Sequence, residues 1–201
     1  VSNAMITGEL QRLHGQGVRY IFPIHVIDNK FGGTAVYKDM FSISNLREYG
    51  SFWDVECSPI AANVDYRFVV QGFDAAVAAV KVTKLGIDPT RVPPPPPPCP
   101  VGSGHVNRKG LTPQGEFAVK EMMKLGMLVD IDHMSEKSAN RALQIAESVR
   151  GGYPINSGHN GYRGNAGNEN SRTDEQIRKI AALGGIFGVG TEAITAKTFV
   201  S

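Results

Sequence analysis

Helices and short apolar strands alternate from residue 110 to residue 189, and this alternation limits the fold more than any other feature of the sequence. The strands are apolar runs instead of alternating apolar and polar residues, which is typical of strands buried on both faces. Such strands form a parallel sheet covered by helices, so the predicted fold class is α/β. We expect helices at 113–125, 135–149 and 173–183, and strands at 127–132, 153–156 and 185–189.

Each of these three helices carries a start signal. Thr112 is placed to cap the first helix, with Pro113 in its first turn. Ser135 is placed to cap the second, and Thr173 with Gln176 forms a capping box for the third. These signals fix the helix starts to within a residue or two.

A further helix and strand are predicted in the first thirty residues, at 5–16 and 18–25. Ile6, Leu10 and Leu13 share one face of that helix, which is the spacing of an amphipathic helix. A doubly wound sheet and a β/α barrel both satisfy the whole pattern. The sequence contains neither a dinucleotide fingerprint nor a Walker loop to favour the doubly wound sheet.

Residues 31–109 are less regular, and we predict that they form an irregular insertion. A strand is expected at 65–71, a helix at 73–85, and a run of six prolines occupies 93–98. A proline run adopts an extended polyproline II helix. It can be a ligand for an aromatic-lined groove, but a stiff connection or surface loop is the more common role.

The composition is that of a globular protein, with 201 residues of which 41% are hydrophobic. Residues 1–201 are therefore predicted to form part of one domain. A complete β/α barrel takes roughly 250 residues. Four expected strands and a long insertion are too little to close such a barrel, so on the barrel alternative the chain is a partial TIM-type barrel and an internal piece of a longer chain.

The charge balance excludes several classes of partner. Lys and Arg number 21 against 19 acidic residues, a net charge of +2, which does not suggest nucleic-acid binding. The longest apolar runs are far shorter than the roughly 20 residues that span a bilayer, so no transmembrane helix is expected. The cellular location stays open, as does a homo-oligomeric state.

Two cysteines, Cys57 and Cys99, are too few for a disulfide scaffold and do not form a Cys-x-x-Cys motif. They could pair, but two free, chemically idle thiols are the favoured interpretation. On this interpretation the redox compartment is undecided.

Three of the five histidines, His25, His133 and His159, lie at or just past the carboxyl ends of predicted strands. In a β/α barrel these ends form one face, where side chains from separate strands converge on a ligand. Imidazole nitrogens are ligands that zinc prefers. Any one of the three alone would more simply bond a neighbouring loop. His14 and His105 lack this placement and are expected at the surface.

Two carboxylates lie just before His133 in the same predicted strand. Either Asp130 or Asp132 could orient an imidazole as an outer partner of a metal site. For Asp132, a helix-capping or solvated carboxylate is about equally well supported.

Several motifs in order resemble the membrane dipeptidase (renal dipeptidase) family of zinc peptidases, in the amidohydrolase superfamily. They are Gly-Leu-Thr-Pro-Gln-Gly at 110–115, Val-Lys-Glu-Met-Met-Lys-Leu-Gly at 119–126, Met-Leu-Val-Asp-Ile-Asp-His at 127–133, Pro-Ile-Asn-Ser-Gly-His at 154–159, Thr-Asp-Glu-Gln-Ile-Arg-Lys-Ile-Ala at 173–181 and Gly-Gly-Ile-Phe-Gly-Val at 184–189, together with Gly-Val-Arg-Tyr at 17–20 and His25.

The resemblance implies a β/α barrel with a binuclear zinc site. It assigns His133 and His159 as ligands of one zinc, and His25 as the residue that contacts the scissile carbonyl or its oxyanion. The implied reaction is hydrolysis of a dipeptide or a similar small amide by metal-activated water.

The chain departs from the family pattern at several points. The family's His-x-Asp pair, bridging Glu and late Asp have no match, so only part of the zinc ligands is present. Asn170 occupies the usual place of the arginine that binds the substrate carboxylate, and Arg163 and Arg172 are the nearby candidates for that role.

Two other functions stay open. One is a non-catalytic, barrel-derived module that binds a partner through the insertion or its proline run. The other is an amidohydrolase that acts on a lactone or a cyclic amide with the same metals.

Overall fold

The computed structural model of the chain describes residues 1–37, 39–61, 96–166 and 168–190. The strand predicted at 65–71, the helix predicted at 73–85 and the first half of the proline run lie outside these ranges. Residues 96–98, the second half of the run, have no regular secondary structure.

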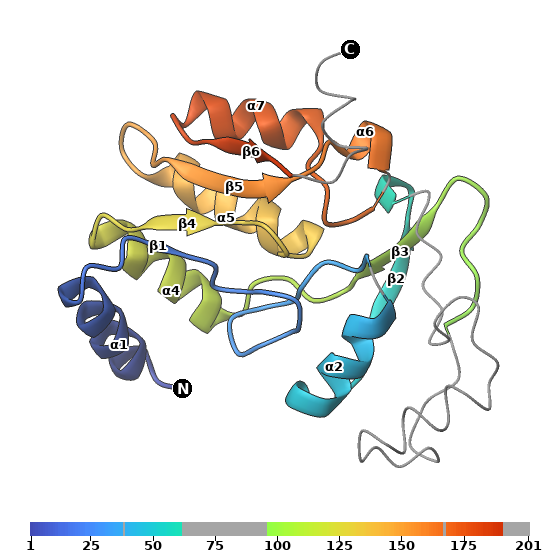
Figure 1. The fold of residues 1–201 in the computed structure, drawn as a ribbon, viewed down its shortest axis with the longest axis horizontal. Helices are drawn as coiled ribbons and strands as arrows, with labels where there is room; N and C mark the ends of the chain where they lie inside the picture. Colours follow the sequence, from blue (N-terminus) through green and yellow to red (C-terminus); the bar gives the residue numbers. More distant parts are fainter. Residues whose placement is uncertain (38, 62–95, 167, 191–201) are drawn as a thin grey trace.

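A four-stranded parallel sheet forms the centre of the molecule (Figure 1). Its strands are β1 (Tyr20–Ile21), β4 (Leu128–Asp130), β5 (Ile155–Asn160) and β6 (Phe187–Val189), in the order β1-β4-β5-β6. All three neighbouring pairs are parallel. The predicted α/β class is confirmed.

The order of the strands across the sheet is their order along the chain. A doubly wound sheet reverses its strand order at a switch point, and this sheet does not. The helices follow the same order, because α1 (Asn3–Gly15) packs on α4 (Pro113–Lys124), α4 on α5 (Glu136–Ser148), and α5 on α7 (Asp174–Ala182). Consecutive strands inside a consecutive layer of helices are the arrangement of a partial β/α barrel.

The helices begin where their caps predict. The hydroxyls of Thr112, Ser135 and Thr173 each accept a hydrogen bond from a backbone N–H of the first helical turn. Gln176 completes the capping box of α7. Such caps satisfy N–H groups that have no partner inside the helix.

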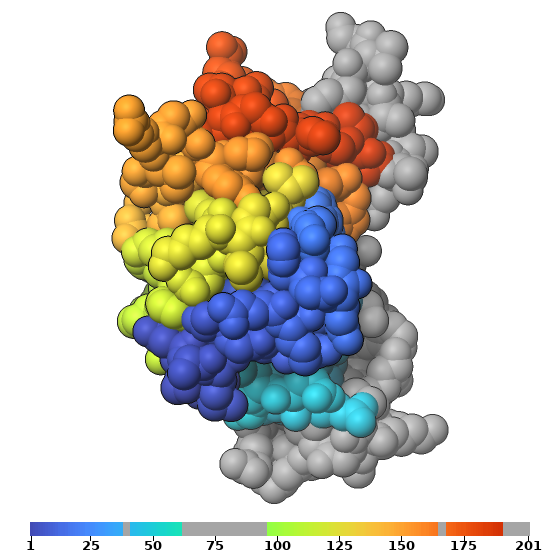
Figure 2. Space-filling model, turned by 90° about the vertical axis from the view of Figure 1, so that its left-hand side faces the viewer, coloured from blue at the N-terminus to red at the C-terminus, as the bar shows by residue number. Residues whose placement is uncertain are grey.

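The core lies between the helices and the sheet. Met122 of α4 and Leu143 of α5 are almost wholly buried against Val129 of β4 and Ile155 of β5. Ile6 of α1 joins the same cluster. Figure 2 shows the N-terminal segment, in blue, lying against the yellow segment of β4 and its flanks, as the pairing of β1 with β4 requires.

All four strands differ in their bounds from the predicted ones: β4 and β6 are shorter than the predicted 127–132 and 185–189, and β1 and β5 differ most. β1 ends at Ile21, because Pro23 follows and cannot donate a ladder hydrogen bond. β5 continues to Asn160, beyond the predicted 156, because Ser157 and Asn160 both pair with β6 across an irregularity in the register. The longer β5 carries His159 inside the strand.

The region predicted as an insertion contributes four further elements. These are α2 (Asp39–Tyr49), the antiparallel pair β2 (Val55–Ser58) and β3 (Gly104–Asn107), and the short η1 (Pro59–Ala61). A short helix, α6 (Arg163–Ala166), lies in the loop after β5. None of these elements was predicted.

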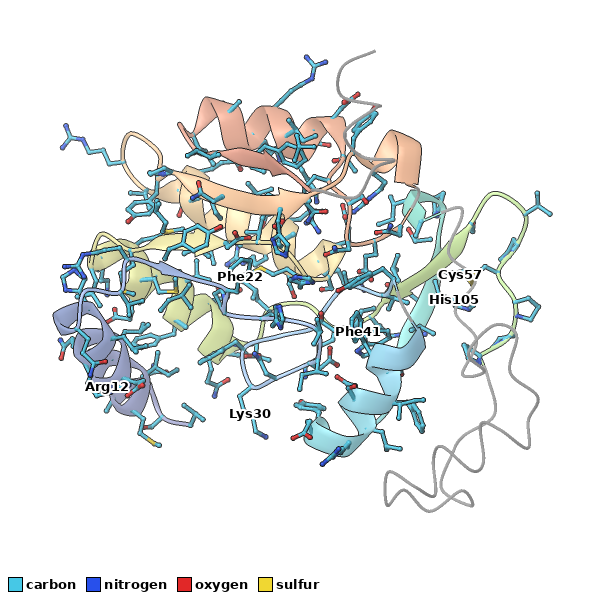
Figure 3. All side chains as sticks on the ribbon, viewed as in Figure 1. Arg12, Phe22, Lys30, Phe41, Cys57 and His105 are labelled. Carbon is cyan, nitrogen blue, oxygen red and sulfur yellow. A yellow bond between two sulfur atoms is a disulfide. The ribbon has the colours of Figure 1, made fainter. Side chains whose placement is uncertain are left out.

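Two predictions in this region are wrong. Cys57 and Cys99 form a disulfide, so neither is a free thiol. His105 is 1% exposed rather than at the surface. It lies opposite Cys57 across the β2–β3 ladder, as the labels in Figure 3 show, and its ring bonds the carbonyl of Pro97. The disulfide thus joins β2 to the segment that precedes β3, beside His105.

Among the described residues, no helix is long and apolar enough to cross a membrane.

Candidate metal centre

His133 and His159 meet at the carboxyl ends of β4 and β5. Their Nε2 atoms are 3.2 Å apart. The His25 ring, which follows β1, has its centroid 4.5 Å from that of His133. Phe22, labelled in Figure 3, lies within 6.3 Å of all three rings. The structure therefore brings together the three histidines that the sequence singled out.

Neighbouring parallel strands account for this convergence. β4 lies between β1 and β5 in the sheet, and the three histidines follow or end these three strands. His133 is 8% exposed, whereas His25 and His159 are open to solvent. His133 is thus the buried member of the cluster, and His25 and His159 are its accessible members.

His133 has a left-handed backbone, with φ of 63°, which is costly for a residue other than glycine. Its N–H donates to Asn170 Oδ1 at 2.9 Å. Its carbonyl accepts from the Ala35 N–H at 2.7 Å and from the Thr34 hydroxyl at 2.7 Å. Strained backbone of this kind persists where the surroundings over-determine it, and it is concentrated at functional sites.

Asp132 holds the His159 ring. Its Oδ2 lies 2.8 Å from His159 Nδ1 and accepts the His159 N–H at 2.7 Å. The carboxylate is fully buried and also accepts from the Ser157 hydroxyl and from Asn160 Nδ2 at 2.6 Å. Asp132 is therefore neither solvated nor helix-capping, and it contacts an imidazole as an outer partner would.

Asp130 has different contacts. Its carboxylate accepts from the Tyr20 hydroxyl, the Gly158 N–H at 3.0 Å and the Asp132 N–H at 2.7 Å. Burial, and then the charge of Asp132, raise the pKa of Asp130 to about 7. These bonds hold the ends of β4 and β5 together.

The two imidazoles face each other through their Nε2 atoms. In a neutral His159 ring whose Nδ1 proton is accepted by Asp132 Oδ2, Nε2 carries a lone pair. Burial, followed by the neighbouring His25 and His159, lowers the pKa of His133 to about 4, so this ring is neutral at pH 7. Two facing acceptors attract each other only through a shared proton or a cation.

The spacing fits a metal ion. Two nitrogens that are each about 2.0 to 2.1 Å from one tetrahedral zinc lie about 3.3 Å apart, and the observed separation is 3.2 Å. Within the described ranges, no third His, Cys, Asp or Glu joins this pair at ligand spacing. The two histidines could therefore supply half of a tetrahedral ligand set.

One group of three metal-ligand types does occur in the described part of the chain. Ligand atoms of Cys57, Cys99 and His105 lie within 4.8 Å of one another. The two sulfurs are bonded to each other, so they offer no thiolate. The histidine pair is the better candidate for a metal.

Arg163 and Arg172 are both enclosed in the loop after β5. Arg172 is fully buried and donates to the carbonyls of Asn170 and Glu169. Arg163 is 7% exposed, donates to the Ser171 carbonyl and pairs with Glu136 at 2.6 Å. Burial, and then the charge of Arg163, lower the pKa of Arg172.

Each of these guanidinium groups keeps one buried nitrogen, Nη1, without a hydrogen-bond partner among the described residues. Unsatisfied buried donors are rare and call for a partner.

Three residues around the centre were not predicted as part of it. Tyr37 Oη lies 3.0 Å from His133 Nδ1. Asn170, noted only for its place in the family pattern, binds the His133 backbone. Glu169 is fully buried and accepts from the backbone N–H groups of Val36, Asn107 and Glu136 at 2.7 to 2.9 Å. No local sequence signal marks contacts between residues so far apart in the chain.

Residues 100–198 match the model of the family described as Membrane dipeptidase (Peptidase family M19). The chain is 49% identical over 37 residues to "Dipeptidase tcpJ" of Claviceps purpurea (strain 20.1), which covers 18% of this chain and 9% of that protein. That segment is short, but its identity is high.

Solved structures of the same kind are similar over part of the chain. The probable dipeptidase PvdM from Pseudomonas aeruginosa is 26% identical, over 40% of this chain and 19% of its own, with a TM-score of 0.36. A metallo peptidase from Rhodobacter sphaeroides, liganded with a phosphinate mimic of the dipeptide L-Ala-D-Ala, is 24% identical over 40% of this chain and 21% of its own, also with a TM-score of 0.36.

The chain thus spans about a fifth of the length of these solved structures and less of the curated relative. The family match covers the segment that carries β4, α5, β5, α7 and β6, and with them both histidines of the facing pair. Through residues 100–198, the chain is therefore similar to the membrane dipeptidase family.

Proposed function

We propose that this chain is part of a zinc-dependent hydrolase that cleaves dipeptides or similar small amides with a metal-activated water. The observation that carries the proposal is the 3.2 Å separation of the His133 and His159 Nε2 atoms, both in the segment that matches the family. His133 and His159 would bind one zinc. A second zinc would need ligands in addition to this pair.

The residues of the chain have distinct roles in this proposal. Asp132 keeps the proton on His159 Nδ1 and so turns the Nε2 lone pair toward the metal. His25 is exposed beside His133 and would donate a hydrogen bond to the substrate carbonyl as negative charge develops there. A zinc ion at the centre would lower the pKa of a bound water and polarise that carbonyl. Asp130 would act as a second outer partner by fixing the strand ends.

Titration of the dialysed chain with zinc chloride tests the metal assignment. We expect one weak site per chain, since two histidines are half of a ligand set. His133→Ala and His159→Ala should each abolish the binding, and His14→Ala, a half-buried histidine on α1, should leave it unchanged. Tight binding would contradict the two-ligand account, and equal binding by all variants would contradict the assigned pair.

Substrate recognition is proposed to involve Arg163 and Arg172, whose buried Nη1 atoms lack partners within the described structure. A dipeptide carries a free carboxylate that such a nitrogen could bind. Cleavage by the full-length protein of a dipeptide, but not of its C-terminal amide, would support this role.

A second candidate reaction is hydrolysis of a lactone or cyclic amide. It is favoured by one observation, the enclosure of both guanidinium groups, which already donate to loop carbonyls. Equal cleavage of the dipeptide and its amide, or cleavage of a cyclic substrate alone, would favour this candidate. A full-length protein that binds zinc and cleaves none of these substrates would favour a binding module.

A further inference from the structure

Tyr37 contacts the buried histidine of the pair from a distant part of the chain. Its Oη lies 3.0 Å from His133 Nδ1, and the two ring centroids are 5.9 Å apart. Tyr37 precedes the family match at 100–198 by more than sixty residues and belongs to the region predicted as an insertion. The contact therefore comes from outside the segment that matches the family.

The contact bears on which nitrogen of His133 carries the proton, because the phenol can either donate to Nδ1 or accept from it. A neutral imidazole has one N–H and one lone pair. Nδ1 faces the oxygen of Tyr37, and Nε2 faces His159. A phenol oxygen can accept the proton of Nδ1, which leaves the lone pair of Nε2 directed at the metal position.

Backbone contacts place Tyr37 for this role. Residues 34–37 run antiparallel to the His133 segment, through a bridge between Thr34 and Met134 and the bond from Ala35 N–H to the His133 carbonyl. The next N–H, that of Val36, donates to the buried carboxylate of Glu169 at 2.7 Å. Tyr37 is thus held by the two residues before it.

Glu169 connects residues 34–37, which we call the strap, to the rest of the centre. The same carboxylate accepts from Asn107 at the end of β3 and from Glu136 at the start of α5. Asn170, the next residue, holds the His133 backbone. The strap, the α5 start and His133 are therefore tied to one pair of adjacent loop residues.

We infer that Tyr37 is a positioning residue for His133: its hydroxyl accepts the Nδ1 proton and directs the Nε2 lone pair toward the metal. This inference rests on the proposed function, in which His133 binds zinc. The two proposed ligands would then differ in their outer partners: His159 has the carboxylate of Asp132, and His133 has the neutral hydroxyl of Tyr37. A residue outside the family match would thereby support the metal site.

Tyr37→Phe tests the inference, because it removes the hydroxyl and keeps the ring that contacts Phe41 at 5.3 Å. Loss of an outer partner typically weakens metal affinity about 10- to 100-fold, and we expect a fall in that range by zinc titration. Tyr49→Phe is the matched control, since it removes a hydroxyl that contacts Lys109. Its zinc affinity should stay within about twofold of the unmodified chain.

The ring tautomer gives a second readout that needs no metal. Nitrogen-15 NMR of the metal-free chain should show His133 protonated at Nδ1, and Tyr37→Phe should shift the proton toward Nε2. A His133 ring protonated at Nε2 in the unmodified chain overturns the inference, even if the variant does not fold. Unchanged affinity and tautomer in Tyr37→Phe also overturn it. Absence of zinc binding by the unmodified chain, with the tautomer as expected, counts against the proposed function instead.

Discussion

The geometry of the candidate centre depends on individual buried side chains. Of these, Asp132 contacts a histidine of the facing pair directly. It accepts four hydrogen bonds, two of them from His159. Asp132→Asn keeps the shape of this side chain but removes the charge and one acceptor. A charged acceptor raises the basicity of the histidine that it holds.

We therefore expect Asp132→Asn to weaken zinc affinity about 10- to 100-fold in a calorimetric titration. Glu175→Gln is the control, since it changes an exposed carboxylate on α7 that pairs with Lys179. Zinc affinity equal in both variants would show that Asp132 does not orient the ligand.

Glu169 should make stability depend on pH. Burial raises its pKa from the ordinary 4.5 to about 7, against the effect of its three backbone N–H donors. Between pH 4.5 and pH 7 the folded state then binds more protons than the unfolded state at this group. The contribution of Glu169 to stability is full below pH 4.5 and decreases as the pH rises to about 7.

Urea unfolding of the unmodified chain and of Glu169→Gln, from pH 4 to pH 8, measures this contribution. The free energy of unfolding of the unmodified chain, relative to the variant, should fall across this window and level off above it. A difference that rises with pH would mean that the donors, and not burial, control the carboxyl group.

At the scale of the elements, features that depend on neighbouring residues could be predicted from the sequence, and features that depend on residues far apart in the chain could not. Thr112, Ser135 and Thr173 start their helices as predicted, because a cap acts on the backbone within three residues. The β2–β3 pair was missed, because its short strands contain Glu56, Cys57 and His105 and carry no clear alternation. Its stability comes from pairing across the chain and from the disulfide.

The residues of the candidate site also fall into those that the sequence could predict and those that it could not. The three histidines could be predicted, because the end of an apolar strand is a local signal and parallel strands end at one face. Tyr37 and Glu169 could not, because their contacts with His133 and with Val36 span 96 and 133 residues. No pattern in the sequence encodes pairs so far apart.

Two helical glycines test how closely elements approach each other. In α4, a methyl group at Gly115 would overlap the carbonyl oxygen of Phe31, whereas at Gly8 in α1 it would meet nothing within 4 Å. Alanine is favoured over glycine in a helix interior by about 0.5 to 1 kcal/mol.

Gly8→Ala should accordingly raise the free energy of unfolding by up to about 1 kcal/mol. Gly115→Ala should lower it by about 1 to 3 kcal/mol, the cost of overpacking a tight contact. Chemical denaturation measures both. A stabilising Gly115→Ala would mean that the 31–33 segment does not pack on α4.

At the scale of the whole molecule, the disulfide ties β2 to the segment before β3. Cys57 and Cys99 are 42 residues apart in sequence. Closing a loop of that length lowers the entropy of the unfolded chain and stabilises the fold by about 4 kcal/mol. The double variant Cys57→Ser with Cys99→Ser should lose stability of this order in urea unfolding.

Dithiothreitol should have the same effect on the unmodified chain and none on the double variant. Equal stability of the reduced and oxidised chains would contradict the disulfide. Zinc binding at His133 and His159 should survive reduction, since no cysteine contacts either ring among the contacts described.

We propose above that one metal ion lies between His133 and His159. X-ray absorption at the zinc edge, on the chain loaded with one equivalent of zinc, measures the ligands of that ion. We expect two imidazole nitrogens at about 2.0 to 2.1 Å, with oxygen ligands completing the shell. His159→Ala should remove this signature. Sulfur ligands at about 2.3 Å, or an unchanged spectrum in His159→Ala, would show that the ion binds elsewhere.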